Sequence, residues 1–386
     1  MVSTTSSSAT APVTFPLSAE AIPRVELSHG DVKAYRQLAD EIVANTLGCE
    51  MEFRHKDHAE LDPHHWKFVK ARERMRVYKR VMPSEALVPM VLGMGFLEGT
   101  IESVLYGLHH KTTEEMRTTT AFLNKGILDT AVLANIDLGT DNDPFRYLGL
   151  KWRVAETPGG NLIKNRDVCN LESLGTATDA HGCSFGYQVL KSVDVPGFPP
   201  FPETVVIRAQ MMLCCIYRQV APNIVAFYAK GVFNLCGDLP EFMAYSTSAD
   251  MVLSIAKAVD CAAAKRLTMM VLQSEVTIEK KSKHSRGLRS HAPRNEKSKS
   301  RATPCTLCGK RPSLLSASCR ACKICAEPVC GKCLVERAVL ARSESVHIMC
   351  CKICVVRSRH LDVDPRQPYP LISLLQPEVE AINYLY

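Results

Sequence analysis

Ten of the seventeen cysteines of this chain lie between Cys305 and Cys354. Two thiolates spaced as Cys-x-x-Cys on one tight turn can both reach a metal ion at about 2.3 Å, and a second such turn completes a tetrahedron. The segment contains four such pairs: Cys305/Cys308, Cys322/Cys325, Cys330/Cys333 and Cys351/Cys354. Eight thiolates predict two zinc ions. Cys319 and Cys350 are left over by this pairing.

The alternatives to metal ligands are disulfides and redox thiols. The opening stretch "MVSTTSSSATAP" has neither the basic start nor the apolar core of a secretory signal, so we expect a reducing cytosol, where structural disulfides are not expected. A segment of about fifty residues also has little core of its own, and bound metal would supply much of its folding free energy. Zinc is therefore the favoured interpretation.

The length and composition of the chain indicate a globular protein with more than one domain. It has 386 residues, of which 46% are hydrophobic and 23% are charged, and we find no apolar run of the length that spans a bilayer. A segment rich in Ser, Lys and Arg, without aliphatic periodicity, indicates a linker. We expect a disordered tail over 1–27, a large domain over 28–275, a basic linker over 276–304, a finger over 305–356 and a tail over 357–386.

The positive charge of the chain is concentrated in the predicted linker. It holds nine Lys or Arg against two Glu, a formal +7 that equals the net charge of the whole chain. Each basic residue close to an anionic lipid leaflet contributes about 1 kcal/mol at most. The linker could also bind RNA or only keep the chain soluble. It has no aromatic residue for base stacking.

The large domain shows a defined order of predicted elements. Helical spacing covers 31–47, alternating residues predict strands over 66–81, a further strand follows over 89–100, and helical spacing returns over 101–123. A run of strands separated by turns then covers 145–235. The last element is a long amphipathic helix after Pro240, with an apolar face formed by Val252, Ile255, Ala256, Val259 and Ala263. An antiparallel sheet of this size needs a cover, and the last helix is the obvious one.

Three stretches give the large domain a family resemblance. "NRDVCNL" (165–171), "VIRAQMMLCCIYR" (206–218) and "NIVAFYAKGVFNLCGDLPEFM" (223–243) resemble the START lipid-transfer domain over about 28–272. The resemblance implies an α+β helix-grip fold, in which an antiparallel sheet and a long C-terminal helix enclose a cavity for one sterol, phospholipid or fatty acyl ligand. Arg153, Arg166 and Arg208 are cavity candidates, although each could instead face solvent or pair with a carboxylate.

The cysteine module resembles a FYVE zinc finger in its spacing, with "AEPV" between Cys325 and Cys330. The resemblance implies a small cross-braced finger with two zinc ions. One ion would be held by Cys305, Cys308, Cys330 and Cys333, and the other by Cys322, Cys325, Cys351 and Cys354. A RING finger is also cross-braced but usually has a histidine ligand, and the one histidine of the module is His347.

The phosphoinositide pocket of that family is largely missing from the module. The family reads phosphatidylinositol 3-phosphate through a strand of arginines and histidines, and of the matching positions 318–326 only Arg320 and Lys323 are basic. The family's tryptophan ahead of the first ligand is absent. Leu314 and Leu315 occupy the place of the hydrophobic turret that inserts into lipid, although a local packing pair is an equal alternative.

These observations predict a protein that binds or transfers a lipid. The finger and the linker would direct it to anionic or phosphoinositide-containing membranes, so we expect a cytoplasmic protein, peripheral on endosomal or other internal membranes. The alternatives are a non-enzymatic adaptor whose finger binds protein and, less favoured, a RING-like ubiquitin ligase. No nucleophile elbow, phosphate loop or coupled Cys/His signature supports catalysis, so we expect no enzyme.

Overall fold

The computed structural model describes residues 13–55, 60–81, 89–160, 163–285, 303–311, 318–341 and 344–371. The predicted turret residues Leu314 and Leu315 and the linker segment 286–302 lie outside these residues. None of the helices described has an apolar stretch long enough to cross a bilayer.

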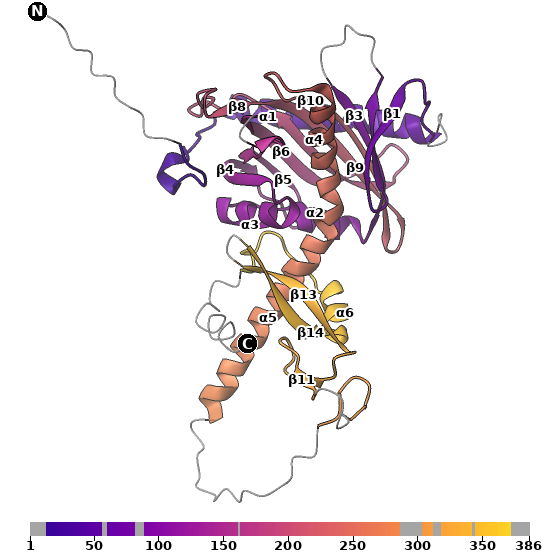
Figure 1. Ribbon diagram of the computed structural model, residues 1–386, viewed down its shortest axis with the longest axis vertical. Helices are drawn as coiled ribbons and strands as arrows, with labels where there is room; N and C mark the ends of the chain where they lie inside the picture. Colours follow the sequence, from indigo (N-terminus) through magenta and orange to yellow (C-terminus); the bar gives the residue numbers. More distant parts are fainter. Residues whose placement is uncertain are drawn as a thin grey trace, which may run out of the picture.

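A ten-stranded sheet forms the large domain, in the order β1-β2-β3-β10-β9-β7-β6-β5-β4 (Figure 1). All neighbours on this path are antiparallel, while β8 pairs with β6 in parallel. The strands are β1 (Trp66–Arg72), β2 (Met75–Arg80), β3 (Met90–Glu98), β4 (Ile127–Asp137), β5 (Tyr147–Ala155), β6 (Asn165–Thr178), β7 (Ser184–Ser192), β8 (Val206–Arg208), β9 (Gln210–Ala221) and β10 (Ile224–Asn234).

Three α-helices come before β4 in the part of the chain that the structure describes, two of them after β3. They are α1 (His29–His55), α2 (Ile101–Leu108) and α3 (Thr113–Leu123). The predicted helical stretch 101–123 is therefore two helices, because Thr112 begins a new one. Its side chain accepts from the N–H of Glu115, whose carboxylate accepts from the N–H of Thr112 in a capping box.

Alternation along the strands divides the sheet into two faces. On β9, Leu213, Cys215 and Tyr217 belong to the core cluster that contains Val252 of the C-terminal helix. The intervening Cys214 and Ile216 belong instead to the cluster that contains residues of α1. We call these the inner face and the outer face.

The long C-terminal helix consists of α4 (Glu241–Ser254), a 3₁₀ turn η3 (Ile255–Lys257) and α5 (Ala258–Ser285). It crosses the inner face of the sheet and then continues beyond the sheet into the finger (Figure 1). It also extends ten residues into the segment 276–304, for which we expected a linker without regular structure.

The finger is built from two hairpins and one helix. Its elements are β11 (Arg320–Ala321), β12 (Pro328–Val329), β13 (Leu334–Ala341), β14 (Glu344–Cys351) and α6 (Lys352–Arg359). Its core includes Val329 and Val339 together with Leu267 and Val271, which come from α5. The finger therefore uses the last helix of the large domain as part of its own core.

Both ends of the large domain are covered by segments expected to be tails. In 13–27, Leu17 packs with the outer-face cluster that contains Trp152, and its N–H donates to the Asp129 carboxylate at 2.7 Å. After α6, Tyr369 lies 2.5 Å, oxygen to oxygen, from the Thr119 hydroxyl, so residues beyond 357 return to the large domain. In both cases apolar side chains find partners that composition alone does not reveal.

The predicted fold class is confirmed. The structure has a large antiparallel sheet with helices, a long C-terminal helix and two groups of cysteines in cross-braced order. The division into domains at the stated boundaries stays a prediction.

Candidate metal centre and ligand cavities

Two groups of four cysteines come together in the finger. Cys305, Cys308, Cys330 and Cys333 form one group, and Cys322, Cys325, Cys351 and Cys354 form the other. Within each group all the sulfur atoms lie within 4.8 Å of one another. The chain order of the pairs alternates between the groups, which is the cross-brace that the FYVE resemblance implies. Each group could bind one metal ion.

The sulfur separations fit a tetrahedral ion with thiolate ligands. Bonds of about 2.3 Å at tetrahedral angles place the sulfurs about 3.8 Å apart. The Sγ atoms of Cys308 and Cys330 are 3.7 Å apart. In the second group, Cys322 and Cys354 are 3.9 Å apart, as are Cys325 and Cys351.

Backbone N–H groups surround the sulfurs and favour their charged form. The N–H of Cys351 donates to the Cys322 sulfur at 3.2 Å, and the N–H of Ile324 donates to it at 3.4 Å. In the other group the backbone of Cys330 and Cys308 lowers the pKa of Cys305 to about 6. At Cys322, burial raises the pKa of the thiol, but the backbone N–H groups lower it, and the net shift is downward. Burial and the neighbouring thiols instead raise the pKa of Cys325, Cys333 and Cys354, so the backbone favours the thiolate form in only part of each group.

The surface of the finger is strongly basic. Between 305 and 359 the chain carries ten Lys or Arg against three Glu, a bias spread well beyond the positions that match the family's headgroup strand. Arg320, on β11, and Lys323 are both exposed. Exposed cations also flank two exposed aliphatic residues of α6, Ile353 and Val356. Cationic and apolar groups therefore lie close together on the exposed surface of α6.

A small cavity of about 70 Å³ lies on the inner face beneath the C-terminal helix. Leu190, Leu213 and Ile255 supply apolar walls, while Arg153 and Glu172 supply polar ones. Buried small-molecule sites usually measure about 300–1,000 Å³, so this volume holds a few waters or a small group and not a whole lipid.

The polar walls of this cavity belong to a buried charge cluster. The Lys151 ammonium contacts the Glu172 carboxylate at 3.1 Å and donates to the carbonyl of His110 at 3.0 Å. Arg153 lies 3.6 Å from the same carboxylate, and its Nε has no partner among the described residues. Burial lowers the pKa of Lys151 to about 8 against the raising effect of Glu172.

The three arginines predicted for the cavity lie in different places. Arg153 lines the inner cavity. Arg166 donates to the backbone carbonyls of Leu235 and Cys236, at 3.2 and 3.0 Å. Arg208 pairs with the Asp167 carboxylate at 2.8 Å. Neither Arg166 nor Arg208 lines the two cavities described here.

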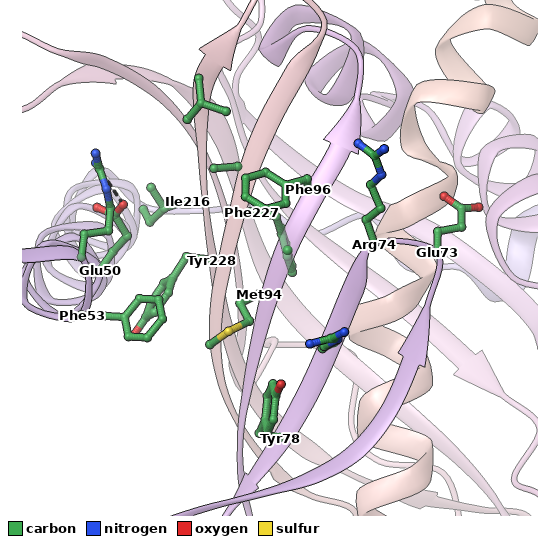
Figure 2. Close-up of a pocket in the computed structure, with 15 residues that line it drawn as sticks. Glu50, Phe53, Glu73, Arg74, Tyr78, Met94, Phe96, Ile216, Phe227 and Tyr228 are labelled. Carbon is green, nitrogen blue, oxygen red and sulfur yellow. Dashed lines mark hydrogen bonds and ion pairs between the residues drawn. The ribbon is translucent and has the colours of Figure 1, made fainter. Parts of the chain in front are cut away.

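The larger cavity lies on the outer face, where sequence reasoning had no candidate. It measures about 700 Å³ and lies between the end of α1 and strands β2, β3, β9 and β10. Figure 2 shows Phe53 of α1 beside Tyr228, with Met94 and Tyr78 on the neighbouring strands. Phe96 and Val220 also line it and are 48% and 52% exposed. We call this feature the outer groove.

No protein-family model matches the sequence, and no curated protein matches it either.

Several solved structures match the fold. Human STARD10 is 16% identical over 54% of this chain and 78% of its own, with a TM-score of 0.39. Human StAR-related lipid transfer protein 5 is 18% identical over 59% of this chain and 97% of its own, with a TM-score of 0.41. A STAR-related lipid transfer protein from Xanthomonas axonopodis is 16% identical over 50% of this chain and 96% of its own, with a TM-score of 0.35.

Proposed function

We propose that the chain binds one lipid, a sterol, a phospholipid or a fatty acyl molecule, on the inner face of the sheet. The observation that carries the proposal is the mixture of polarity there: the charged Arg153 and Glu172 line the same cavity as apolar side chains such as Leu190, Leu213 and Ile255. A polar headgroup or hydroxyl would satisfy the free Nε of Arg153, and an acyl chain or ring system would extend between the sheet and α4. This role involves no reaction.

A whole lipid requires the cavity to open. The 3₁₀ turn η3 begins at Ile255, which lines the cavity, and a stretch of 3₁₀ geometry within a helix often marks a hinge. α4 precedes this turn and packs mainly against β1, β2 and β3. A displacement of α4 about η3 would enlarge the cavity without unfolding the sheet.

We propose further that both groups of cysteines hold zinc and that the finger directs the protein to a membrane. Four sulfurs in tetrahedral spacing are typical of structural zinc. The basic surface, including Arg320 and Lys323, would supply attraction to anionic lipid, and Leu314 and Leu315 would supply an apolar contact. The expected setting is cytoplasmic and peripheral, on endosomal or other internal membranes.

Native mass spectrometry of the purified chain tests the cargo and the metal together. We expect two zinc ions and one lipid per chain. Ser254→Phe, which places a large side chain in the inner cavity, should lower the lipid occupancy and leave the zinc content unchanged. A wild-type chain that carries neither zinc nor lipid would contradict both parts of the proposal.

Flotation with vesicles tests the membrane part. We compare vesicles with and without phosphatidylinositol 3-phosphate at equal total negative charge. Binding that follows total charge and falls steeply with salt would assign the contact to the basic surface, whereas selective binding would assign headgroup reading to Arg320 and Lys323. If the chain floats with neither kind of vesicle, an adaptor whose finger binds protein is favoured instead.

A further inference from the structure

The outer groove has the size and shape of a ligand site. Its volume of about 700 Å³ is ten times that of the inner cavity and falls within the usual range for small-molecule sites. It lies on the face of the sheet opposite α4 (Figure 2). A lipid in the inner cavity would therefore leave it accessible.

The walls of the groove are rich in aromatic and aliphatic side chains that water reaches. The rings of Phe53 and Tyr228 are 5.7 Å apart at one end. At the β2 side, Tyr78 contacts the ring of Phe68, which is 58% exposed and extends the apolar surface. With Phe96, these side chains form a concave apolar surface of a kind that marks binding sites.

The charges around the groove are unevenly compensated. The Glu50 carboxylate accepts from both Nε and Nη2 of Arg218, each at 3.0 Å, so its charge is already paired. Arg74 lies 3.9 Å from Glu98, and both are largely exposed. Arg76 also lines the groove, is exposed, and has no acidic partner among the residues that the structure describes. Arg76 is therefore a cation available to a ligand.

The form of the groove argues against a peptide strand as the occupant. Addition of a strand needs a free sheet edge. The floor is made by β2, β3 and β10, and each of these strands is already paired on both sides. An acyl chain has no backbone N–H or C=O groups that need hydrogen-bond partners, so it fits this surface better than a peptide does.

We propose that the outer groove binds a single-chain anionic amphiphile. The acyl chain lies along Tyr78, Met94 and Phe96, and the carboxylate or phosphate head pairs with Arg76. This site is separate from the inner cavity and does not depend on the function proposed for it.

Calorimetric titration of the whole 386-residue chain, purified with its bound metal, tests the assignment. The probes are oleate, oleoyl lysophosphatidate and uncharged oleyl alcohol, all below their aggregation limits. We expect the two anions to bind, and Arg76→Gln to weaken both by about tenfold while leaving oleyl alcohol unchanged. Lys67→Gln is the matched control, because Lys67 is an exposed cation on the neighbouring strand β1 that does not line the groove.

A second variant tests the place of the acyl chain. Ala226 is half-buried and lines the groove, so Ala226→Trp obstructs it and should remove the part of the anion binding that depends on Arg76. Ser254→Phe, in the inner cavity, should leave that Arg76-dependent part unchanged. The proposal would be overturned if Ser254→Phe removed the binding and Ala226→Trp spared it. It would also be overturned if Arg76→Gln weakened the binding of oleate and of oleyl alcohol equally. Circular dichroism checks the folding of each variant. If Ala226→Trp does not fold, the comparison of Arg76→Gln with Lys67→Gln on charged and uncharged probes still tests the proposal.

Discussion

Leu340 of the finger and Thr268 of the C-terminal helix are joined by a buried hydrogen bond. The N–H of Leu340 donates to the Thr268 hydroxyl at 2.9 Å, and that hydroxyl in turn donates to the carbonyl of Ala264. Leu267 and Val271, on either side of Thr268, pack into the finger core. α5 is thus a structural part of both units, and their stabilities should be linked.

Removal of the metal should destabilise the large domain. Both tryptophans, Trp66 and Trp152, lie in that domain, so tryptophan fluorescence reports on it alone. We expect a strong chelator to lower its unfolding temperature by about 2–4 °C for each kcal/mol of lost support. Thr268→Val should reduce this difference, because it removes the bond to Leu340. Equal unfolding temperatures with and without metal would show that the two units are independent.

Loss of one ligand should lower the zinc content. Cys330→Ser and Cys354→Ser each remove one thiolate from a different group, and we expect at most one tightly held ion to remain in each variant. Cys319→Ser is the control, since Cys319 belongs to neither group and should leave the content at two. Elemental analysis after gel filtration makes the measurement. An unchanged content in both ligand variants would reject the assignment.

Removal of the buried carboxylate of Glu172 should be costly. Glu172→Gln leaves Lys151 and Arg153 without their shared anion, and breaking such a buried pair costs about 3 kcal/mol or more. Glu102→Gln is the control, because Glu102 also pairs with an arginine, Arg266, but is half exposed. We expect less than about 1 kcal/mol there. Urea unfolding measures both, and comparable losses would contradict the buried charge cluster.

The contribution of Lys265 to stability should depend on pH. Burial lowers the pKa of this fully buried lysine from its ordinary 10.5 to about 8. The unfolded chain therefore binds more protons than the folded chain between these values, and the stability that depends on Lys265 rises with pH across this window. Above pH 8, the free energy of unfolding of the wild type should therefore rise relative to that of Lys265→Met by up to about 1.4 kcal/mol per pH unit.

Urea unfolding at pH 7.5, 8.5 and 9.5 checks this dependence. Comparison of wild type with the variant cancels the titration of the other buried groups. Lys257→Met controls for the loss of a lysine charge from the adjoining turn η3. A difference between wild type and Lys265→Met that stays constant over the three pH values would disprove the expectation.

The metal centre is the part of the site that the sequence predicts best, because a Cys-x-x-Cys turn positions its two sulfurs locally. The succession of most strands along the chain could also be predicted from the sequence, because turn residues separate them. β4 was missed: in "ILDTAVLANID" the apolar residues alternate only in part, and the strand is recognisable mainly from its pairing with β5. The helical character of 276–285 was missed as well, because charge and serine content dominate that segment.

The cavities were predicted less well. "LGLKWRVAE" does place Lys151 and Arg153 on one face and Trp152 on the other, so the polar end of the inner face had a signal in the alternation. The outer groove had none. It exists because α1 continues to His55 and brings Phe53 against Tyr228, a contact between residues 175 positions apart. Such a contact depends on how the helix lies on the sheet.

The shared helix α5 also fixes a distance. From Ile255 at the inner cavity to Val271 in the finger core, sixteen residues of helix span about 24 Å at 1.5 Å per residue. Both ends of this span belong to one continuous helical segment, η3 followed by α5. A change in the separation of Ile255 and Val271 would therefore require that segment to bend, so spin labels at the two positions would report directly on its stiffness.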